Sequence, residues 1–243
     1  DEVFGEECIP DFDIDNARFV LSFGSDFLST WISPLRYARG FGEFRQGEKA
    51  QQHGRGTLVQ VDSRFSMTAA NADQWVPIRP GTEGALALSL AYVIQRRRGE
   101  DVSELEEYTP NSAASVTGVS KDTIMKLAED LMTNLPSVVI GGGSAAAQTN
   151  GSFNLKAIYA LNYLVNTPGA KSDEAGIVFN PRPLSYPADF AKTANLFGEW
   201  KTIRNDMSQG KIKVLITRGI NPAHGLTNID FRGALNRSDI FIT

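Results

Sequence analysis

The feature that most constrains the fold is a repeated alternation of short apolar runs with helical patterns. The apolar runs occupy residues 17–23, 57–61, 137–140 and 212–217, and each is followed by a turn that contains glycine or aspartate. Short runs of this kind are typical of strands buried on both faces, and parallel strands need a long crossover between them. The alternation therefore predicts an α/β fold with mainly parallel sheets.

The segments between the runs differ in character. An apolar stripe that begins after Gly84 predicts a long helix, and Ser120 is a suitable N-cap for another. Residues 31–39 are predicted as a short helix, residues 40–56 as a polar, glycine-rich loop and residues 171–194 as a proline-rich connector.

The length of 243 residues suits one large domain or two modest ones. A change of pattern near Leu135 and Pro136 predicts a boundary there, with units at 1–135 and 136–243. The acidic N-terminal segment lacks the layout of a signal peptide, and the C-terminal residues stop within a predicted strand. We therefore expect a piece of a longer protein.

Composition excludes several classes of function. With 24 Lys and Arg against 28 Asp and Glu, the net charge of −4 does not favour binding to nucleic acid or to a membrane surface. Cys8 is the only cysteine, and His53 and His224 are the only histidines, which excludes an internal disulfide and a cysteine-rich metal or iron–sulfur site. The longest apolar runs are too short to span a bilayer.

A first turn with groups suited to a ligand contains Phe23, Gly24, Ser25 and Asp26. In an open parallel sheet, ligands bind beyond the carboxyl ends of the strands. Gly24 lacks the Cβ that would keep a phosphate away, and Ser25 and Asp26 can hydrogen-bond a ribose or a base edge. The same residues also make an ordinary surface loop, so the turn alone does not decide between the two.

The second turn contains Asp62, Ser63 and Arg64. A carboxylate at the end of the second strand of a nucleotide-binding unit can accept hydrogen bonds from ribose hydroxyls. The spacing of 38 residues from Gly24 to Asp62 and the lack of a GxGxxG pattern argue against ordinary NAD binding. The alternative is that Asp62 is a strand-end cap paired with Arg64.

The third turn, formed by Gly81, Thr82 and Glu83, opens the predicted long helix. The Glu83 carboxylate could accept two hydrogen bonds from a guanine, whose N1–H and N2–H₂ are two parallel donors. The alternative is structural, with Thr82 as the N-cap and Glu83 at the positive end of the helix dipole.

Two further turns of this kind lie in the second half. Gly142 and Gly143 belong to a glycine-rich turn that can cradle phosphate, but the Gly-Lys-Ser/Thr ending of a P-loop is missing, which disfavours phosphoryl transfer. Gly219 and Asn221 form a turn that presents an amide side chain. Cys8 is interpreted as a spare residue, because no histidine lies in a suitable partner motif.

Taken in order, these turns and their flanks form a recognisable series. It begins with ARFVLSFGSDFLSTW, continues with LVQVDSRF and ADQWVPIRPGTEGALAL, and ends with SVVIGGGSAAAQTNG and IKVLITRGINPAHG. The series resembles the molybdopterin oxidoreductases, the dimethyl sulfoxide reductase superfamily, from about Pro10 to the last residue. The RPGTEGALAL block is the most specific part of the resemblance.

The resemblance implies two Rossmann-like units that bind molybdopterin guanine dinucleotide, with molybdenum or tungsten between two such cofactors in the parent protein. The family's metal ligand and iron–sulfur cysteines precede these elements, so no catalytic or metal-ligating residue is implied here. The implied cofactor-binding residues are Phe23, Gly24, Ser25, Asp26, Leu28, Asp62, Ser63, Arg64, Gly81, Thr82, Glu83, Gly142, Gly143, Gln148, Gly219 and Asn221.

Three positions depart from the family pattern. Asp26 replaces an asparagine, Ser63 a proline, and Glu83 the guanine-reading aspartate. A carboxylate at Asp26 would repel a pyrophosphate that it faced. The segment FGSDFLSTWISP also resembles relatives that keep the fold without the cofactor, as structural or electron-transfer subunits of iron–sulfur membrane complexes such as alternative complex III.

The leading hypothesis is the central cofactor-domain portion of a molybdopterin oxidoreductase large subunit, which supports two-electron redox chemistry in the parent and is inactive alone. Its implied partners are the rest of the parent chain, an iron–sulfur electron-transfer subunit and a membrane-anchor subunit. The resemblance favours a periplasmic or membrane-complex location. The alternatives are the cofactor-less subunit and a simple nucleotide- or sugar-binding α/β protein.

Overall fold

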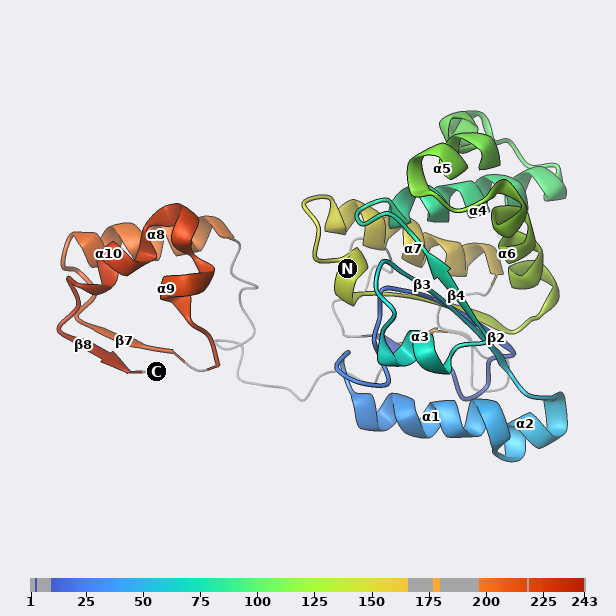
Figure 1. The fold of residues 1–243 in the computed structure, drawn as a ribbon, viewed down its shortest axis with the longest axis horizontal. Coiled ribbons are helices and arrows are strands. Elements are labelled where there is room, and N and C mark those ends of the chain that lie inside the picture. The colour runs from blue at the N-terminus through green and yellow to red at the C-terminus, as the bar shows by residue number, and fades with distance from the viewer. Residues whose placement is uncertain (1–2, 4–9, 166–176, 180–196, 218, 243) are drawn as a thin grey trace. The chain divides into compact units, whose positions relative to one another are not determined.

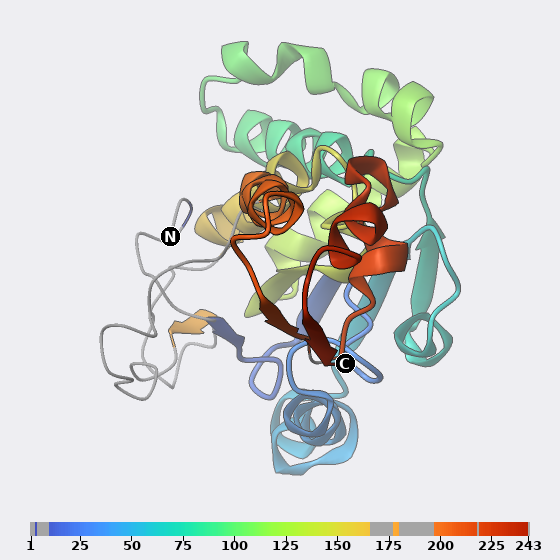
Figure 2. The same ribbon diagram turned by 90° about the vertical axis from the view of Figure 1, so that its left-hand side faces the viewer.

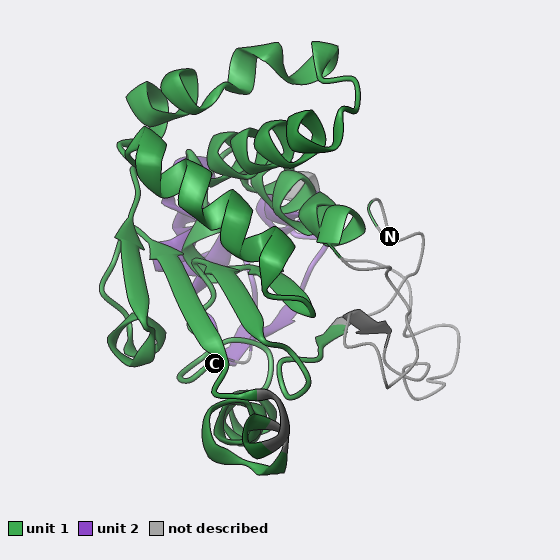
Figure 3. Ribbon diagram, turned by 90° about the vertical axis from the view of Figure 1, so that its right-hand side faces the viewer, with its two compact units in different colours: residues 1–183 green, residues 184–243 purple. Residues whose placement is uncertain are grey.

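The chain forms two compact units, Asp1–Pro183 and Leu184–Thr243 (Figures 1 and 3). The computed structural model describes residues 3, 10–165, 177–179, 197–217 and 219–242. The expected connector at residues 171–194 lies outside the described residues, apart from the short strand β6 (Ile177–Phe179).

A parallel sheet of four strands forms the centre of the first unit, in the order β4-β3-β2-β5. The strands are β2 (Phe19–Phe23), β3 (Thr57–Asp62), β4 (Gln74–Pro77) and β5 (Ser137–Gly141). The chain moves outward from β2 to β4 and then returns to the other side of β2, so the strand order reverses between β2 and β5. The predicted α/β class with a mainly parallel sheet is confirmed.

Successive side chains of the strands face two separate apolar cores. Phe19, Leu21 and Phe23 pack into one core with α4 (Glu83–Arg98), α6 (Lys121–Thr133) and α7 (Gly151–Val165). Val20 and Leu58 face the opposite core, to which α1 (Pro34–Gln46) contributes Tyr37 and Phe44. Figure 1 shows α4, α6 and α7 on one side of the sheet and α1 with α2 (Glu48–His53) on the other.

The remaining elements of this unit are short. Strand β1 (Pro10–Phe12) pairs antiparallel with β6. The others are α3 (Met67–Asn71), the 3₁₀ turns η1 (Ser103–Tyr108) and η2 (Gly143–Ala145), and α5 (Pro110–Thr117).

The prediction of a loop at residues 40–56 is wrong, because α1 and α2 occupy most of this segment. Pro34 begins α1, and Tyr37 and Phe44 are buried two helical turns apart. Gly40 lies inside the helix, where a Cβ would come within 2.4 Å of the Asp15 Oδ1 atom. The glycine that suggested a loop therefore permits a close contact within a helix.

The structure divides the chain later than the expected boundary between residues 135 and 136. Strand β5 pairs with β2 along its whole length, from Phe19 opposite Ser137 to Phe23 opposite Gly141. Residues 136–165 therefore belong to the first unit, which runs to Pro183, and the second unit begins with Leu184.

The second unit is small and contains a two-stranded parallel sheet (Figure 2). Its core consists of Met207, Phe231 and Ala234 with partly buried neighbours. Its elements are α8 (Phe197–Ser208), β7 (Val214–Ile216), α9 (Pro222–Gly225), η3 (Thr227–Ile229), α10 (Phe231–Leu235) and β8 (Ile240–Ile242).

Candidate functional site

The turns after β2 and β5 interlock at the carboxyl edge of the sheet. The Gly142 amide donates to the Phe23 carbonyl at 3.1 Å, and the Ser144 amide donates to the Gly24 carbonyl at 3.3 Å. Gly24 has a φ of +66°, and a Cβ there would lie 2.5 Å from Ser144 Oγ and 2.7 Å from the Ala145 nitrogen. Both the backbone angle and the close approach therefore require glycine at position 24.

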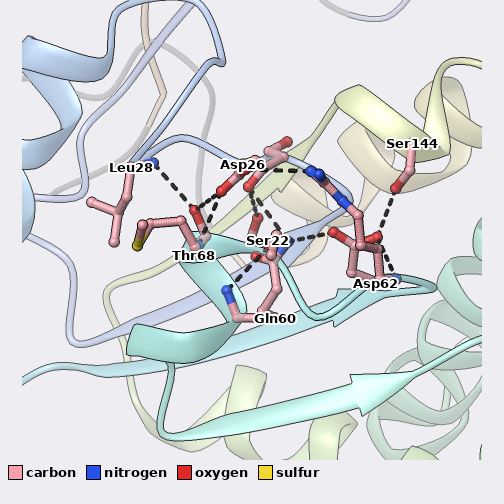
Figure 4. Close-up of polar contacts among 12 residues, drawn as sticks. Ser22, Asp26, Leu28, Gln60, Asp62, Thr68 and Ser144 are labelled. Atoms are coloured by element: carbon pink, nitrogen blue, oxygen red, sulfur yellow. Dashed lines mark hydrogen bonds and ion pairs between the residues drawn. The ribbon is translucent and has the colours of Figure 1, made fainter.

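Asp62 ends β3 at this same edge and is buried, with 1% of its surface exposed. Its Oδ1 atom accepts from the Ser144 hydroxyl at 2.9 Å and from the Arg64 amide at 3.2 Å. Its Oδ2 atom accepts from the Gln60 amide nitrogen at 3.4 Å. Figure 4 shows that the Asp62 carboxylate thus joins β3 to the turn after β5.

The carboxylate of Asp26 is held from the other side. Its Oδ1 atom accepts from the amide and the hydroxyl of Thr68, at 3.0 and 2.9 Å, and its Oδ2 atom pairs with the Arg64 guanidinium at 3.3 Å (Figure 4). The Arg64 side chain pairs with Asp26, whereas its backbone amide contacts Asp62. Arg64 therefore offsets the negative charge of Asp26.

Glu83 opens α4 and is buried, with 1% of its surface exposed. Its Oε2 atom accepts from the Asn154 amide nitrogen at 3.1 Å, and its Oε1 atom has no hydrogen-bond partner in the described part of the chain. Burial raises the pKa of the Glu83 carboxyl, the nearby Asp62 charge acts in the same direction, and the amides of Glu83 and Gly81 oppose both. Thr82 occupies the N-cap position, but its hydroxyl donates backward to the Arg79 carbonyl at 2.7 Å.

The other implied residues have varied surroundings. The Phe23 ring lies in the core, and the Ser25 carbonyl accepts from the buried Ser22 hydroxyl at 3.4 Å. The Leu28 amide donates to the Thr68 hydroxyl, and the Gln148 side chain donates to the Ser144 carbonyl. Ser63 is exposed, and Gly81 has a φ of +82°. Gly143 also has a positive φ, of +50°.

Gly219 and Asn221 belong to the second unit, where the Asn221 side chain accepts from the His224 amide at 3.2 Å. The structure thus brings together the implied residues of the first unit. It does not place Gly219 and Asn221 relative to the residues of the first unit.

Sequence reasoning missed three residues that hold the site together. Thr68 lies in a segment without a clear pattern, and Ser144 lies in the glycine-rich turn, where nothing in the sequence indicates its distant partner Asp62. Asn154 carries a readable signal, because it shares the buried face of α7 with Ile158 and Leu161. A polar residue on such a stripe needs a buried hydrogen-bond partner.

The described residues contain no group of three or more His, Cys, Asp and Glu side chains that could hold a metal ion. Among these same residues, no helix is long and apolar enough to cross a membrane.

An open sheet whose turns meet where the strand order reverses defines a doubly wound α/β domain, of the class that binds ligands at this edge. The sequence profile described as molybdopterin oxidoreductase matches residues 3–243. The chain belongs to the molybdopterin oxidoreductase family, as its sequence series predicted.

Several relatives match most of this chain but only part of their own length. Dimethyl sulfoxide reductase DmsA of Escherichia coli K12 is 28% identical over 76% of this chain and 26% of its own length. The molybdopterin-containing subunit ArrA of the arsenate respiratory reductase of Chrysiogenes arsenatis is 28% identical over 69% of this chain and 23% of its own. The molybdopterin-binding-like subunit of the menaquinone reductase of Nitratidesulfovibrio vulgaris is 27% identical over 93% of this chain and 33% of its own.

Acetylene hydratase from Pelobacter acetylenicus shares the fold, with a TM-score of 0.53 and 23% identity over 69% of this chain and 23% of its own. The chain spans about a quarter of the length of DmsA and ArrA.

Proposed function

We propose that this chain is the cofactor-domain portion of a molybdopterin oxidoreductase large subunit, and that Gly24, Asp62 and Glu83 bind the nucleotide end of a molybdopterin guanine dinucleotide. The observation that carries the proposal is the Glu83 Oε1 atom, a buried carboxylate oxygen without a partner among the described residues. An unpaired buried acceptor is costly, and a donor on a ligand base would satisfy it.

Each residue of this edge has a distinct part in the proposed binding. Asp62 accepts from a ribose hydroxyl, and Glu83 accepts from the base. Arg64 neutralises Asp26, so that a pyrophosphate meets no bare carboxylate. In the turn after β5 the Gly142 amide already donates to the Phe23 carbonyl, so the Gly143 amide is the further donor proposed for the phosphates. These residues suit the nucleotide, and they bind and orient it without taking part in the chemistry.

When bound in the parent protein, the cofactor supplies a molybdenum or tungsten centre that exchanges two electrons with a substrate. The proposed partners are the rest of the parent chain, an iron–sulfur electron-transfer subunit and a membrane-anchor subunit, in a periplasmic or membrane-bound complex. The resemblance of the motifs supports these assignments, and so does the similarity to subunits of reductases.

A cofactor-less structural subunit is the second candidate, and one contact favours it. Ser144 fills the space beside Gly24 and hydrogen-bonds Asp62, so protein atoms already use groups that a nucleotide would need. The relative that matches 93% of this chain is named a molybdopterin-binding-like subunit.

Titration calorimetry with GDP separates the two candidates, with ADP as the control for simple phosphate binding. We expect GDP to bind weakly. Glu83→Gln should raise the Kd for GDP at least about fivefold, because the loss of one hydrogen bond costs roughly 1 kcal/mol. Glu104→Gln, at an exposed position, should leave GDP binding unchanged. Equal and negligible heats for GDP and ADP would favour the cofactor-less subunit.

A further inference from the structure

Asn154 is buried completely and makes contacts with two separate turns. Its amide nitrogen donates to Glu83 Oε2 and to the Ala145 carbonyl, each at 3.1 Å. Its Oδ1 atom accepts from the Gly84 amide at 3.1 Å. One side chain therefore joins the start of α4 to the turn after β5.

A second asparagine, Asn150, contacts the first residue of the segment from Gly81 to Gly84, which leads into α4. Asn150 precedes α7, and its amide nitrogen donates to the Gly81 carbonyl at 2.8 Å and to Asn154 Oδ1 at 3.4 Å. The two residues are four positions apart, and we call them the asparagine clamp. The clamp therefore hydrogen-bonds the segment from Gly81 to Gly84 at both of its ends.

The fit around the clamp is close. A Cβ on Gly84 would lie 2.7 Å from Asn154 Oδ1, so the backbone of α4 approaches this side chain more closely than any other residue would allow. Ala145 follows Ser144, which bonds Asp62. The clamp thus connects the Glu83 turn to the same turn after β5 that holds Asp62.

We propose that Asn154 is the positioning residue of this site: it holds Glu83 Oε2 within the protein and leaves Oε1 as the single acceptor for a ligand base. This inference rests on the proposed function, because it concerns the residue that orients the base-reading carboxylate. Oε2 already accepts from Asn154, whereas both lone pairs of Oε1 are unused. We therefore expect a base to be held through Oε1 by one hydrogen bond, rather than by the parallel pair that guanine can offer.

A double-mutant cycle in the full 243-residue chain tests the contact without any ligand. Asn154→Asp keeps the size of the side chain and the acceptor for Gly84, but places a second carboxylate against Glu83. Glu83→Gln supplies an amide that can donate to that aspartate. The matched control is Asn162→Asp, because Asn162 is equally buried in α7 and its side chain hydrogen-bonds backbone atoms of Val139 and Tyr159 instead of a carboxylate.

At pH 7.5, Asn154→Asp should lower Tm by about 5 °C or more when Glu83 is present, and by less than half as much beside Glu83→Gln. Asn162→Asp should lower Tm equally in both backgrounds. An equal loss from Asn154→Asp in both backgrounds would overturn the inference. Should Asn154→Asp alone not fold, folding of the double variant supports the contact, and failure of both variants overturns it.

Titration of the unaltered chain with GDP and with inosine diphosphate tests the single acceptor. The hypoxanthine base has the N1–H donor of guanine but lacks its amino group. We expect the two Kd values to agree within about threefold, whereas a preference for GDP of about tenfold, the effect of one more hydrogen bond, would overturn the single-acceptor inference. If neither nucleotide binds while the cycle shows coupling, the proposed function fails and the positioning contact stands.

Discussion

At the scale of single residues, the carboxylates at the sheet edge are each satisfied in a different way. Asp26 combines an ion pair with two hydrogen bonds from Thr68, and Asp62 accepts from a hydroxyl and from amides. Glu83 Oε2 accepts from the Asn154 side chain, and Oε1 has no hydrogen-bond partner in the described part of the chain. Because an unpaired buried acceptor is costly, Glu83 is where a ligand would contribute most.

Thr68→Val should destabilise the first unit by about 1–3 kcal/mol, the cost of leaving buried polar groups unpaired. The change removes a donor to Asp26 Oδ1 and the acceptor of the Leu28 amide. Thr133→Val is the control, because the Thr133 hydroxyl is exposed, donates to the Glu129 carbonyl of its own helix and accepts from the neighbouring Asn134 side chain at 3.5 Å. Urea unfolding measures both, and a Thr68→Val loss no larger than that of the control would contradict the prediction.

The sequence alone predicts one residue of each of these contacts, but it does not predict the partner of that residue. Gly24 and Asp62 stand directly after apolar runs, so their place at a sheet edge follows from local pattern, and Glu83 opens the predicted long helix. Ser144 and Asp62 are 82 positions apart, and their contact depends on β5 returning to the far side of β2. Local pattern carries no information about that return.

At the scale of elements, the turns after β2 and β5 pack so closely that only glycine fits at position 24 between them. Gly24→Ala should cost about 2 kcal/mol or more, because a Cβ would clash with the backbone of η2 at a φ of +66°. Gly42→Ala, in α1 with no atom near its Cβ position, should instead stabilise by about 0.5–1 kcal/mol. Chemical unfolding of both variants should give changes of opposite sign, and changes of the same sign would refute this account.

A buried arginine joins several elements on the side of the sheet that α1 covers. Arg45 lies in the last turn of α1 and donates to the Gly56 carbonyl at 2.7 Å and to Asp73 at 2.5 Å. Asp73 also accepts from Arg55 and from the Leu58 amide of β3. Burial acts to raise the pKa of Asp73, but the Leu58 amide and the two guanidinium groups outweigh it, so the pKa is lowered.

Stability from Asp73 should therefore depend on acid in a defined direction. A carboxyl whose pKa is lowered in the folded state contributes stability above its unfolded pKa of about 3.9, and loses it as pH falls through the folded value. Asp73→Asn should lower Tm clearly at pH 6, and the gap to the unaltered chain should narrow toward pH 3. Asp239→Asn, at an exposed position, should show little gap at either pH. A constant Asp73→Asn gap would contradict the prediction.

Elements with a long apolar stripe could be predicted, whereas those stabilised by close contacts could not. The stripe of Leu86, Leu90 and Val93 indicates α4, and Ser120 caps α6 as expected, accepting from the Thr123 amide. Helix α1 contains two glycines and several polar residues, a composition typical of a loop. It is a helix because Tyr37 and Phe44 pack on the sheet. Tertiary packing overrides local preference there.

At the scale of the whole molecule, the α/β class and the family could be predicted because both depend on the order of motifs along the chain. The boundary between units could not, since it depends on which strands pair. The sequence changes character near Pro136, yet the next strand completes the existing sheet. A change of pattern therefore marked the crossover between β4 and β5 and not the end of a unit.

The second unit presents an apolar sheet face that distinguishes it from the first. In the register of β7 and β8, Val214 pairs with Ile240 and Ile216 with Ile242, so these four side chains share one face. Their exposed fractions are 49, 51, 69 and 49%, respectively. Parallel sheets are normally covered on both faces, and an uncovered aliphatic face of this kind promotes association.

We therefore expect the chain to self-associate as its concentration rises, and Ile216→Lys to shift it toward the monomer. Lysine at the most exposed of the four positions places a charge on the apolar face, at a residue outside the core of Met207 and Phe231. Leu35→Lys is the matched control, because Leu35 is 80% exposed in the first unit and belongs to no such face. Sedimentation velocity over a range of concentrations provides the measurement. A chain that stays monomeric throughout, or an equal response to both lysines, would show that this face does not drive association.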